Sequence, residues 1–211
     1  MLSLTGLGLL LQISVPTRQR RPAFDREQGI AIAQALFHHR GYDAVSLSEL
    51  TEAMNIKPPS FYAAYGSKAE LFERAMRRYA GEKALPLDKL LTPDLPPEAA
   101  LTSLLVAAAK QYGDADLRGC LVTEGLRADD PVARSMAEKL GEAAIQTMRH
   151  YLDQVCPGSA QALTDYLVIT LRGLSAAACS GMSRERLIEV AQIAGKAISG
   201  EFEASGTAAD S

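Results

Sequence analysis

Cys120 is the residue with the clearest potential for covalent chemistry in this sequence. It stands in the segment Arg-Gly-Cys-Leu, with Arg118 two residues before it and a predicted helix start directly after it. A neighbouring cation and a helix start are surroundings that activate a thiol toward oxidants and electrophiles. A free cysteine is, however, among the residue types most often buried in a core. We therefore expect Cys120 to be a packing residue, and thiol-based sensing is the alternative.

The number and spacing of the cysteines and histidines argue against metal and disulfide sites. The sequence contains Cys120, Cys156, Cys179, His38, His39 and His150. An odd, sparse set of cysteines without a C-x-x-C pair excludes a disulfide framework and a zinc finger, and it fits a reducing compartment. The sequence has no glycine-rich phosphate loop and no carboxylate–histidine metal motif. These observations predict a cytoplasmic protein with no metal, no cofactor and no enzymatic activity.

Charge is distributed unevenly along the chain, although the net charge is only −3. Residues 18–83 contain 11 basic and 8 acidic side chains, whereas residues 84–211 contain 11 basic and 17 acidic ones. The excess of positive charge in the smaller part indicates an anionic partner for the N-terminal third. Hydrophobic residues make up 47% of the chain, a globular balance that excludes a mainly disordered protein.

The first 17 residues carry no charge and include six leucines. A signal peptide has positive charge before its apolar stretch, but here the arginines follow it. The apolar run over residues 7–15 is also too short to span a bilayer. We expect residues 1–17 to be a disordered leader or the product of a mis-set start codon, rather than a targeting signal, and we expect no membrane partner.

Helix start and stop signals are dense in the first third of the chain. Three pairs have the spacing of capping boxes: Asp25 with Gln28, Ser46 with Glu49, and Ser67 with Glu70. The first predicted helix ends at Gly41, and the second is closed within a few turns by Asn55 and Pro58. The third begins at Pro58 and ends at Gly66. Two short helices joined by a tight turn, the second starting with proline, are typical of a helix-turn-helix.

The rest of the chain also predicts helices. Four prolines in residues 86–97 mark a hinge. Beyond the hinge, three- and four-residue apolar spacing predicts helices over residues 98–112, near Cys120, and over residues 131–155, 160–179 and 184–202. No strand pattern competes with them. We therefore predict an all-α protein with a DNA-binding domain at 18–83, a ligand-binding and dimerisation domain at 84–204, and a disordered tail at 205–211.

The predicted helix-turn-helix carries side chains that suit DNA. The N-terminal residues of a recognition helix meet base edges in the major groove, and small residues such as Ser60 and Ala63 allow close approach. Lys57, Tyr62 and Lys68 can donate to phosphates. Each of these side chains also has a structural interpretation when it is considered alone. Their combination with the ordered caps, the turn and the basic flank is much more specific.

The stretch GYDAVSLSELTEAMNIKPPSFYAAYGSKAELF (residues 41–72), together with its flanks over residues 24–79, closely resembles the DNA-binding domain of the tetracycline-repressor (TetR) family. Asn55 departs from the glycine usual in the family, but asparagine tolerates the same conformation. The resemblance implies a homodimer on a palindromic double-stranded operator and a C-terminal domain that senses a small molecule. The DNA-binding residues that it implies are Arg20, Arg21, Ser46, Lys57, Pro58, Ser60, Tyr62, Tyr65 and Lys68.

The C-terminal part carries less specific signals. Its last two predicted helices are apolar on more than one face, which indicates burial against another helix pair. We expect dimerisation through Leu163, Leu167, Leu171, Leu174, Leu187, Ala191, Ala194 and Ile198; the alternative is that they fill the core of a single chain. By residue type, the candidates for an effector pocket are Tyr112, Cys120, Glu124, Met148, Tyr151 and Arg172.

The sequence as a whole favours a ligand-responsive transcriptional repressor that a small molecule releases from its operator. The direction of regulation stays open, since an activator would have the same helices. Three alternatives are a regulator that senses through the Cys120 thiol, an enzyme, and a helical ligand carrier that has lost DNA binding. No partner residues support an enzyme. The basic flank and the intact recognition region argue against a simple carrier.

Overall fold

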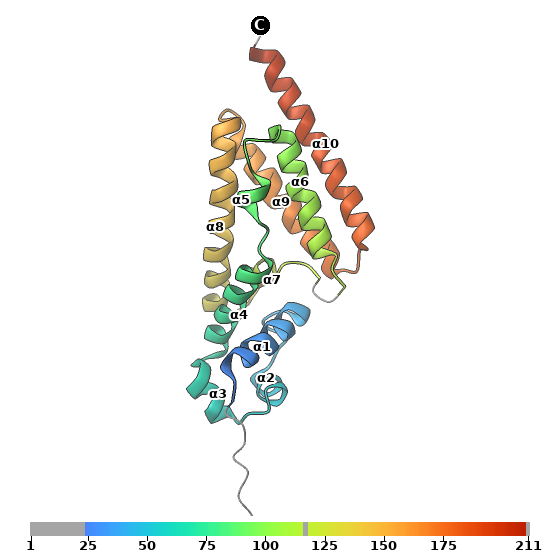
Figure 1. Ribbon diagram of the computed structural model, residues 1–211. Helices are drawn as coiled ribbons and strands as arrows, with labels where there is room; N and C mark the ends of the chain where they lie inside the picture. The colour runs from blue at the N-terminus through green and yellow to red at the C-terminus, as the bar shows by residue number, and fades with distance from the viewer. Residues whose placement is uncertain (1–23, 116–117, 210–211) are drawn as a thin grey trace, which may run out of the picture.

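The computed structural model describes residues 24–115 and 118–209, which form ten α-helices and no strand. The molecule is elongated, with a small cluster of helices at one end and a longer helical bundle at the other (Figure 1). The predicted leader over residues 1–17 and the arginines Arg20 and Arg21 lie outside the described residues. The predicted all-α fold, with an N-terminal helix-turn-helix and a C-terminal helical part, is confirmed.

The small cluster contains α1 (Arg26–Arg40), α2 (Leu47–Ala53) and α3 (Pro58–Tyr65). Its helices begin where the sequence places capping residues. Asp25 accepts hydrogen bonds from two amides of the first turn of α1, and Ser46 and Glu49 form a complete, reciprocal capping box at α2. Asn55 takes the left-handed conformation, with φ of 52°, in the turn before α3.

Helix α4 (Lys68–Lys83) joins this cluster to the bundle (Figure 1). Ser67 caps it by accepting a hydrogen bond from the amide of Glu70 at 3.1 Å. In its first half, Phe72 packs edge-on against Phe37 of α1, with ring centroids 5.0 Å apart. Its last turns extend toward the bundle, so one rigid helix serves both parts of the molecule.

The bundle is built from six further helices. These are α5 (Leu87–Leu90), α6 (Pro97–Tyr112), α7 (Leu121–Gly125), α8 (Pro131–Val155), α9 (Ala160–Cys179) and α10 (Arg184–Ala209). The sequence did not predict α5, which forms within the proline-rich hinge. Helix α10 extends to Ala209, beyond the predicted helix end at residue 202.

Helix α9 is long and apolar enough to cross a membrane by length and composition alone. It packs against α6, α8 and α10, and 33% of its most apolar window is buried inside the molecule. The hydroxyl of the buried Thr164 donates a hydrogen bond to the carbonyl of Ala160, one turn earlier in the same helix, at 2.7 Å.

The leucine stripes of α9 and α10 mostly face the interior of this chain. Helix α6 lies against both helices, and their apolar faces pack on it. Seven of the eight residues are buried within the chain, namely Leu163, Leu167, Leu174, Leu187, Ala191, Ala194 and Ile198. Leu171 is half-buried and lines a cavity. The alternative, that these residues fill the core of a single chain, is the one the structure supports.

Two hydrophobic cores hold the molecule together. The upper core joins α6, α8, α9 and α10. The lower core contains α1 to α4, but it also includes Leu121 of α7 and Ala128, Ala133 and Ala137 around the start of α8. The predicted domain boundary after residue 83 coincides with the end of α4, whereas the lower core extends beyond it into the second part of the chain.

Candidate DNA-binding surface and effector cavity

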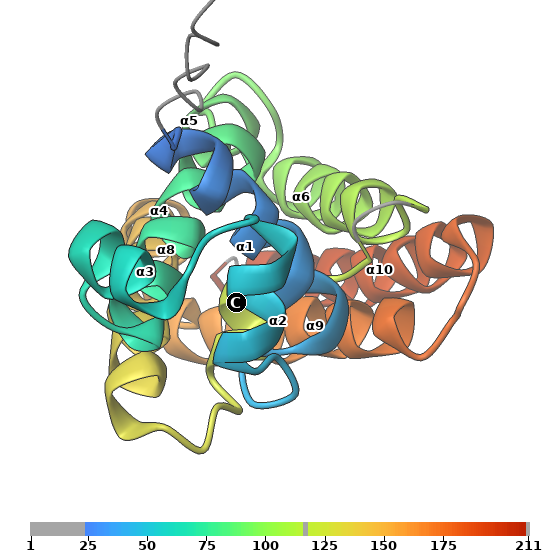
Figure 2. The ribbon, with the colours of Figure 1, turned by 90° about the horizontal axis from the view of Figure 1, so that it is seen from below.

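Helix α3 has one face in the core and one face in solvent. Phe61, Ala64 and Tyr65, at the spacing of one helical face, are buried. The opposite face exposes Pro58, Pro59, Ser60, Tyr62 and Ala63. Viewed from the lower end of the molecule, α2 and α3 lie in front of the bundle helices (Figure 2). A short helix that exposes small and polar side chains at the end of an elongated molecule is well shaped to enter a major groove.

The residues just before α2 and α3 are exposed as well. Lys57 occupies the N-cap position of α3 and has no capping hydrogen bond through its side chain, so its ammonium is available to a phosphate. The Ser46 hydroxyl accepts from the amide of Glu49 and donates to its carboxylate at 2.8 Å. The hydroxyl therefore holds the start of α2 in position.

The turn between α1 and α2 is fixed by an ion pair. The Arg40 guanidinium lies 2.5 Å from the Glu49 carboxylate and donates to the carbonyl of Ala44 at 2.8 Å. The Ser46 amide and then Arg40 stabilise the carboxylate and lower the pKa of Glu49 to about 2. Glu49 consequently stays ionised at any pH at which the protein is used, and the capping box and the ion pair persist together.

Tyr65 does not belong to the DNA-binding surface, contrary to the prediction. It is fully buried, and its hydroxyl donates to the carbonyl of Arg26 in α1 at 2.9 Å. Its ring meets Phe24 and Phe61 edge-on, with centroids 6.0 and 5.5 Å away. Tyr65 therefore fixes α3 against α1. Tyr62 is the aromatic side chain of α3 that points outward, with 53% of its surface exposed.

Lys68 faces the junction between the two parts of the molecule. Its ammonium lies 4.1 Å from the centre of the Tyr42 ring, a cation–π contact. Burial lowers the pKa of Lys68, while the nearby carboxylates of Asp43 and Asp130 oppose that shift. A phosphate contact by Lys68 stays a prediction, and it requires the ammonium to leave the Tyr42 ring.

The α1–α2 loop is bonded to the start of α8. The Tyr42 hydroxyl donates to the Asp130 carboxylate at 2.7 Å, and the Asp43 carboxylate accepts from the amide of Asp129 at 2.9 Å. Asp130 is also the N-cap of α8, where it accepts from the amide of Val132 at 2.8 Å. A movement of α8 is therefore passed directly to the loop that precedes α2.

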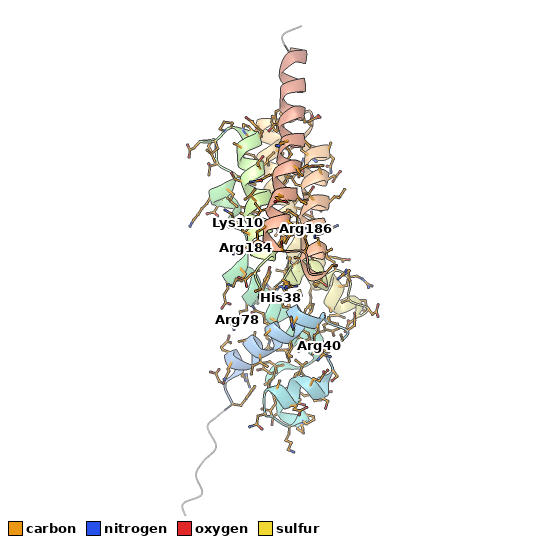
Figure 3. All side chains as sticks on the ribbon, turned by 90° about the vertical axis from the view of Figure 1, so that its right-hand side faces the viewer. His38, Arg40, Arg78, Lys110, Arg184 and Arg186 are labelled. Carbon is orange, nitrogen blue, oxygen red and sulfur yellow. The ribbon has the colours of Figure 1, made fainter. Side chains whose placement is uncertain are left out.

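His38 makes a second connection between the two parts (Figure 3). It is buried near the end of α1, and its Nε2 lies 3.3 Å from the carbonyl oxygen of Gly119, the residue before Cys120. Since a carbonyl can only accept, Nε2 carries the proton. Within the described residues Nδ1 has no hydrogen-bond partner. Its ring meets the Tyr79 ring edge-on, with centroids 5.1 Å apart.

The pH dependence of stability should report the burial of His38. Desolvation lowers its pKa below the ordinary value of 6.5, against the opposing influence of Glu124. The unfolded chain then binds more protons, so stability is lost as the pH falls from 6.5 through the lower, folded-state pKa. We expect the wild type to lose more stability than His38→Gln between about pH 8 and about pH 5, as measured by urea unfolding. Parallel losses in the two proteins would contradict this assignment.

A cavity of about 220 Å³ lies between the last turns of α4 and the middle of the bundle. Four of the six predicted pocket residues line it, namely Tyr112, Cys120, Met148 and Arg172. Tyr79, Lys83 and Gln111 also line it and were not predicted. Their position could have been inferred in part from the sequence, because Tyr79 and Lys83 are four residues apart and therefore lie on the same face at the end of α4.

Glu124 and Tyr151 do not line the cavity. Glu124 forms an ion pair with Arg127 at 2.5 Å, and its carboxylate also accepts a hydrogen bond from the Cys179 thiol. Tyr151 is buried in the upper core, and its hydroxyl has no partner among the described residues. Both were predicted from residue type alone, and residue type does not determine which face of a helix a side chain occupies.

Cys120 is held at the cavity wall by its neighbours. Its amide donates to the Ser175 hydroxyl at 2.9 Å, and Tyr79 and Tyr112 line the same cavity beside it. The Arg118 guanidinium, which the sequence offered as an activating cation, lies beside Gly181. A half-buried thiol beside two phenols is better suited to packing and recognition than to redox chemistry.

Comparisons with known proteins agree with this geometry. The family model for bacterial regulatory proteins of the tetR family matches residues 30–75. The HTH-type transcriptional repressor BdcR of Escherichia coli (strain K12) is 43% identical over 89% of this chain and 94% of its own length. ComR of the same organism, also an HTH-type transcriptional repressor, is 27% identical over 83% of this chain and 89% of its own length.

A solved structure resembles this chain along almost its whole length. The TetR family transcriptional regulator CifR, as a cysteine mutant complexed with a 26bp double-strand operator DNA, is 31% identical with a TM-score of 0.73. The match covers 84% of this chain and 99% of that chain. These relatives are transcriptional regulators, not enzymes. With an exposed recognition helix, a largely apolar cavity and a relative of this identity and coverage, the chain belongs to the TetR family of bacterial regulatory proteins.

Proposed function

We propose that this protein is a homodimeric repressor that binds a palindromic operator and is released by a small molecule bound in the cavity. The observation that carries the proposal is the position of α4, which begins directly behind α3 and ends as a wall of the cavity. One helix thus contacts both the DNA-binding unit and the effector site. The operator-bound structure of CifR and the repressor names of BdcR and ComR support the same function.

The outer face of α9 and α10 is suited to pair two copies of the chain. Ile169 on α9 is 70% exposed and Ile193 on α10 is 65% exposed, and Val190 lies one turn before Ile193. The exposed small residues Gly173 and Ala176 on α9 permit close helix approach. Pairing this face with its copy would bury an apolar patch in a four-helix arrangement.

Effector binding can reach DNA by two routes that the contacts define. In the first, Tyr79 and Lys83 line the cavity, so a ligand that displaces them shifts α4 and therefore α3. In the second, Cys120 lines the cavity and the preceding Gly119 carbonyl is bonded to His38 of α1. A ligand shifts operator binding only if it prefers one arrangement of the two DNA-binding units, with a typical coupling of about 5- to 150-fold.

The proposal is tested by footprinting on the DNA that flanks the gene of this protein. A dimer places two recognition helices in successive major grooves, so protected half-sites should lie about 10 base pairs apart or at a multiple of that distance. A single asymmetric site without a repeat would contradict dimeric operator binding. If no site in this flanking DNA is protected, the protein does not repress the genes next to its own.

Replacing Lys57 with alanine should weaken binding to every DNA sequence tested. A phosphate contact carries no base information, so the loss should be similar for operator and unrelated DNA, and the salt dependence of log K should flatten by about one unit. Lys110→Ala is the matched control, because Lys110 is equally exposed but lies on α6 of the bundle (Figure 3). A changed base preference with an unchanged salt dependence would show that Lys57 reads bases instead.

A further inference from the structure

The charged residues that line the cavity are of one sign. Lys83 comes from the last turn of α4 and Arg172 from α9, and no aspartate or glutamate lines the cavity within the described residues. Neither of the two cations forms an ion pair with any described residue. Both residues are exposed and line the cavity, so either can pair with an anion bound there.

The neutral polar groups of the cavity include three hydroxyls that can donate a hydrogen bond. Burial raises the pKa of both Tyr79 and Tyr112, so their hydroxyls stay protonated and can donate. Thr123 adds a third hydroxyl. The Gln111 amide nitrogen donates to the carbonyl of Lys83 at 2.6 Å, which holds the end of α4 against α6. A ligand with strong acceptor atoms matches this set, whereas an ammonium group meets no carboxylate.

The remaining wall defines the size and nature of the rest of the ligand. It is apolar, formed by side chains that include Leu85, Leu140, Ile145, Met148 and Leu171. An apolar cavity of about 150 Å³ accepts benzene, so the volume here suits a body of roughly ten heavy atoms. The cavity therefore combines a small apolar interior with two cations and several donors.

We propose that the effector of this regulator is a small organic monoanion, a carboxylate with an apolar body of roughly ten heavy atoms, bound through Lys83 and Arg172. The inference rests on the proposed function, since it names the chemistry of the molecule that the cavity takes. The apolar wall holds the body, and the two cations and the phenols hold the carboxylate.

Isothermal titration calorimetry of the full chain with four probes tests the class. The probes are octanoate, octan-1-ol, 3-phenylpropanoate and 3-phenylpropan-1-ol, which form two pairs with the same apolar body and a different head group. We expect each carboxylate to bind about tenfold more tightly than its alcohol, or better, because hydrogen bonds from the two cations to a charged group are stronger than hydrogen bonds to a neutral hydroxyl. Alcohols that bind as tightly as the carboxylates, or carboxylates that do not bind, would overturn the proposal.

Two variants assign the effect to the named cations. Lys83→Met and Arg172→Met keep the apolar stem and remove the charge, so each should weaken carboxylate binding by about fivefold to tenfold and leave the alcohols unchanged. Lys110→Met, outside the cavity, should change neither. Equal weakening of acids and alcohols would indicate distortion of the cavity and would contradict a charge-specific role.

A mobility shift with operator DNA separates this inference from the proposed function. If operator binds and the carboxylates bind but do not release it, the ligand class stands and induction by ligand is wrong. If operator binds and no carboxylate is bound, repression stands and the ligand class is wrong. Failure of operator binding itself, with carboxylates bound, would contradict the proposed function alone.

Discussion

Replacing Ile193 with aspartate should give a monomer whose operator affinity is at least about 100-fold lower than that of the wild type. Ile193 is 65% exposed at the centre of the proposed pairing face of α9 and α10. In a dimer, two aspartates would be buried near each other without partners, a cost that a helix interface of this kind does not offset. Loss of the second DNA-binding unit removes the intramolecular gain in affinity, which amounts to about 10²–10⁴.

Val132→Asp is the matched control for this experiment. Val132 is 53% exposed near the start of α8, away from α9 and α10, so the substitution adds the same charge at a similarly exposed apolar position. Light scattering after gel filtration gives the molecular mass, and a mobility shift gives the operator affinity. An Ile193→Asp protein that stays dimeric, or a Val132→Asp protein that becomes monomeric, would place the pairing face elsewhere.

Replacing Gly29 with alanine should destabilise the protein by about 2–4 kcal/mol, although alanine is the better helix former. Gly29 lies in α1 against the core, and a Cβ atom there would sit 1.9 Å from the Tyr65 hydroxyl oxygen and 2.8 Å from the Phe24 ring. The Tyr65 ring cannot move freely, because it is fully buried. The ring must shift and give up its hydrogen bond to the Arg26 carbonyl.

The control is Gly81→Ala, at a helical glycine where an added Cβ meets nothing within 4 Å. Removing the backbone freedom of glycine in α4 should stabilise the protein by about 0.5–1 kcal/mol. Tyr65→Phe in the Gly29→Ala background removes the clashing oxygen and should recover part of the loss. Urea unfolding measures all four proteins. Equal effects at the two glycines would show that propensity, and not the Tyr65 ring, decides the cost at Gly29.

The helices of the helix-turn-helix were largely predictable from sequence because their signals are local. The caps at Asp25, Ser46 and Ser67 and the stops at Gly41 and Gly66 each depend on residues within one turn. Helix α5 was missed because its four residues lie among prolines, which normally indicate a loop. The end of α10 was missed because small and polar residues carry no apolar periodicity.

Burial could not be predicted in the same way, because it depends on which other helix packs against a given face. Tyr62 and Tyr65 are alike in sequence, and the contact of α3 with α1 alone makes one exposed and the other buried. The apolar stripes of α9 and α10 were expected to pair two copies, because the sequence does not show that α6 packs against them. A pocket was expected in the C-terminal part, but Lys83 could be assigned to it only when the end of α4 and α9 were placed together.

The lower hydrophobic core has a consequence for how this protein can be recombined. Its helix-turn-helix is not a detachable module, because Leu121 and Ala137, from beyond the linker helix, complete the packing around it. A Cβ atom on Gly125 would sit 2.8 Å from the Ala137 side chain and 3.1 Å from the Phe72 ring, so α7 fits closely between α4 and α8. A chimera that exchanges effector specificity must therefore keep α7 and the first turns of α8 with the DNA-binding unit.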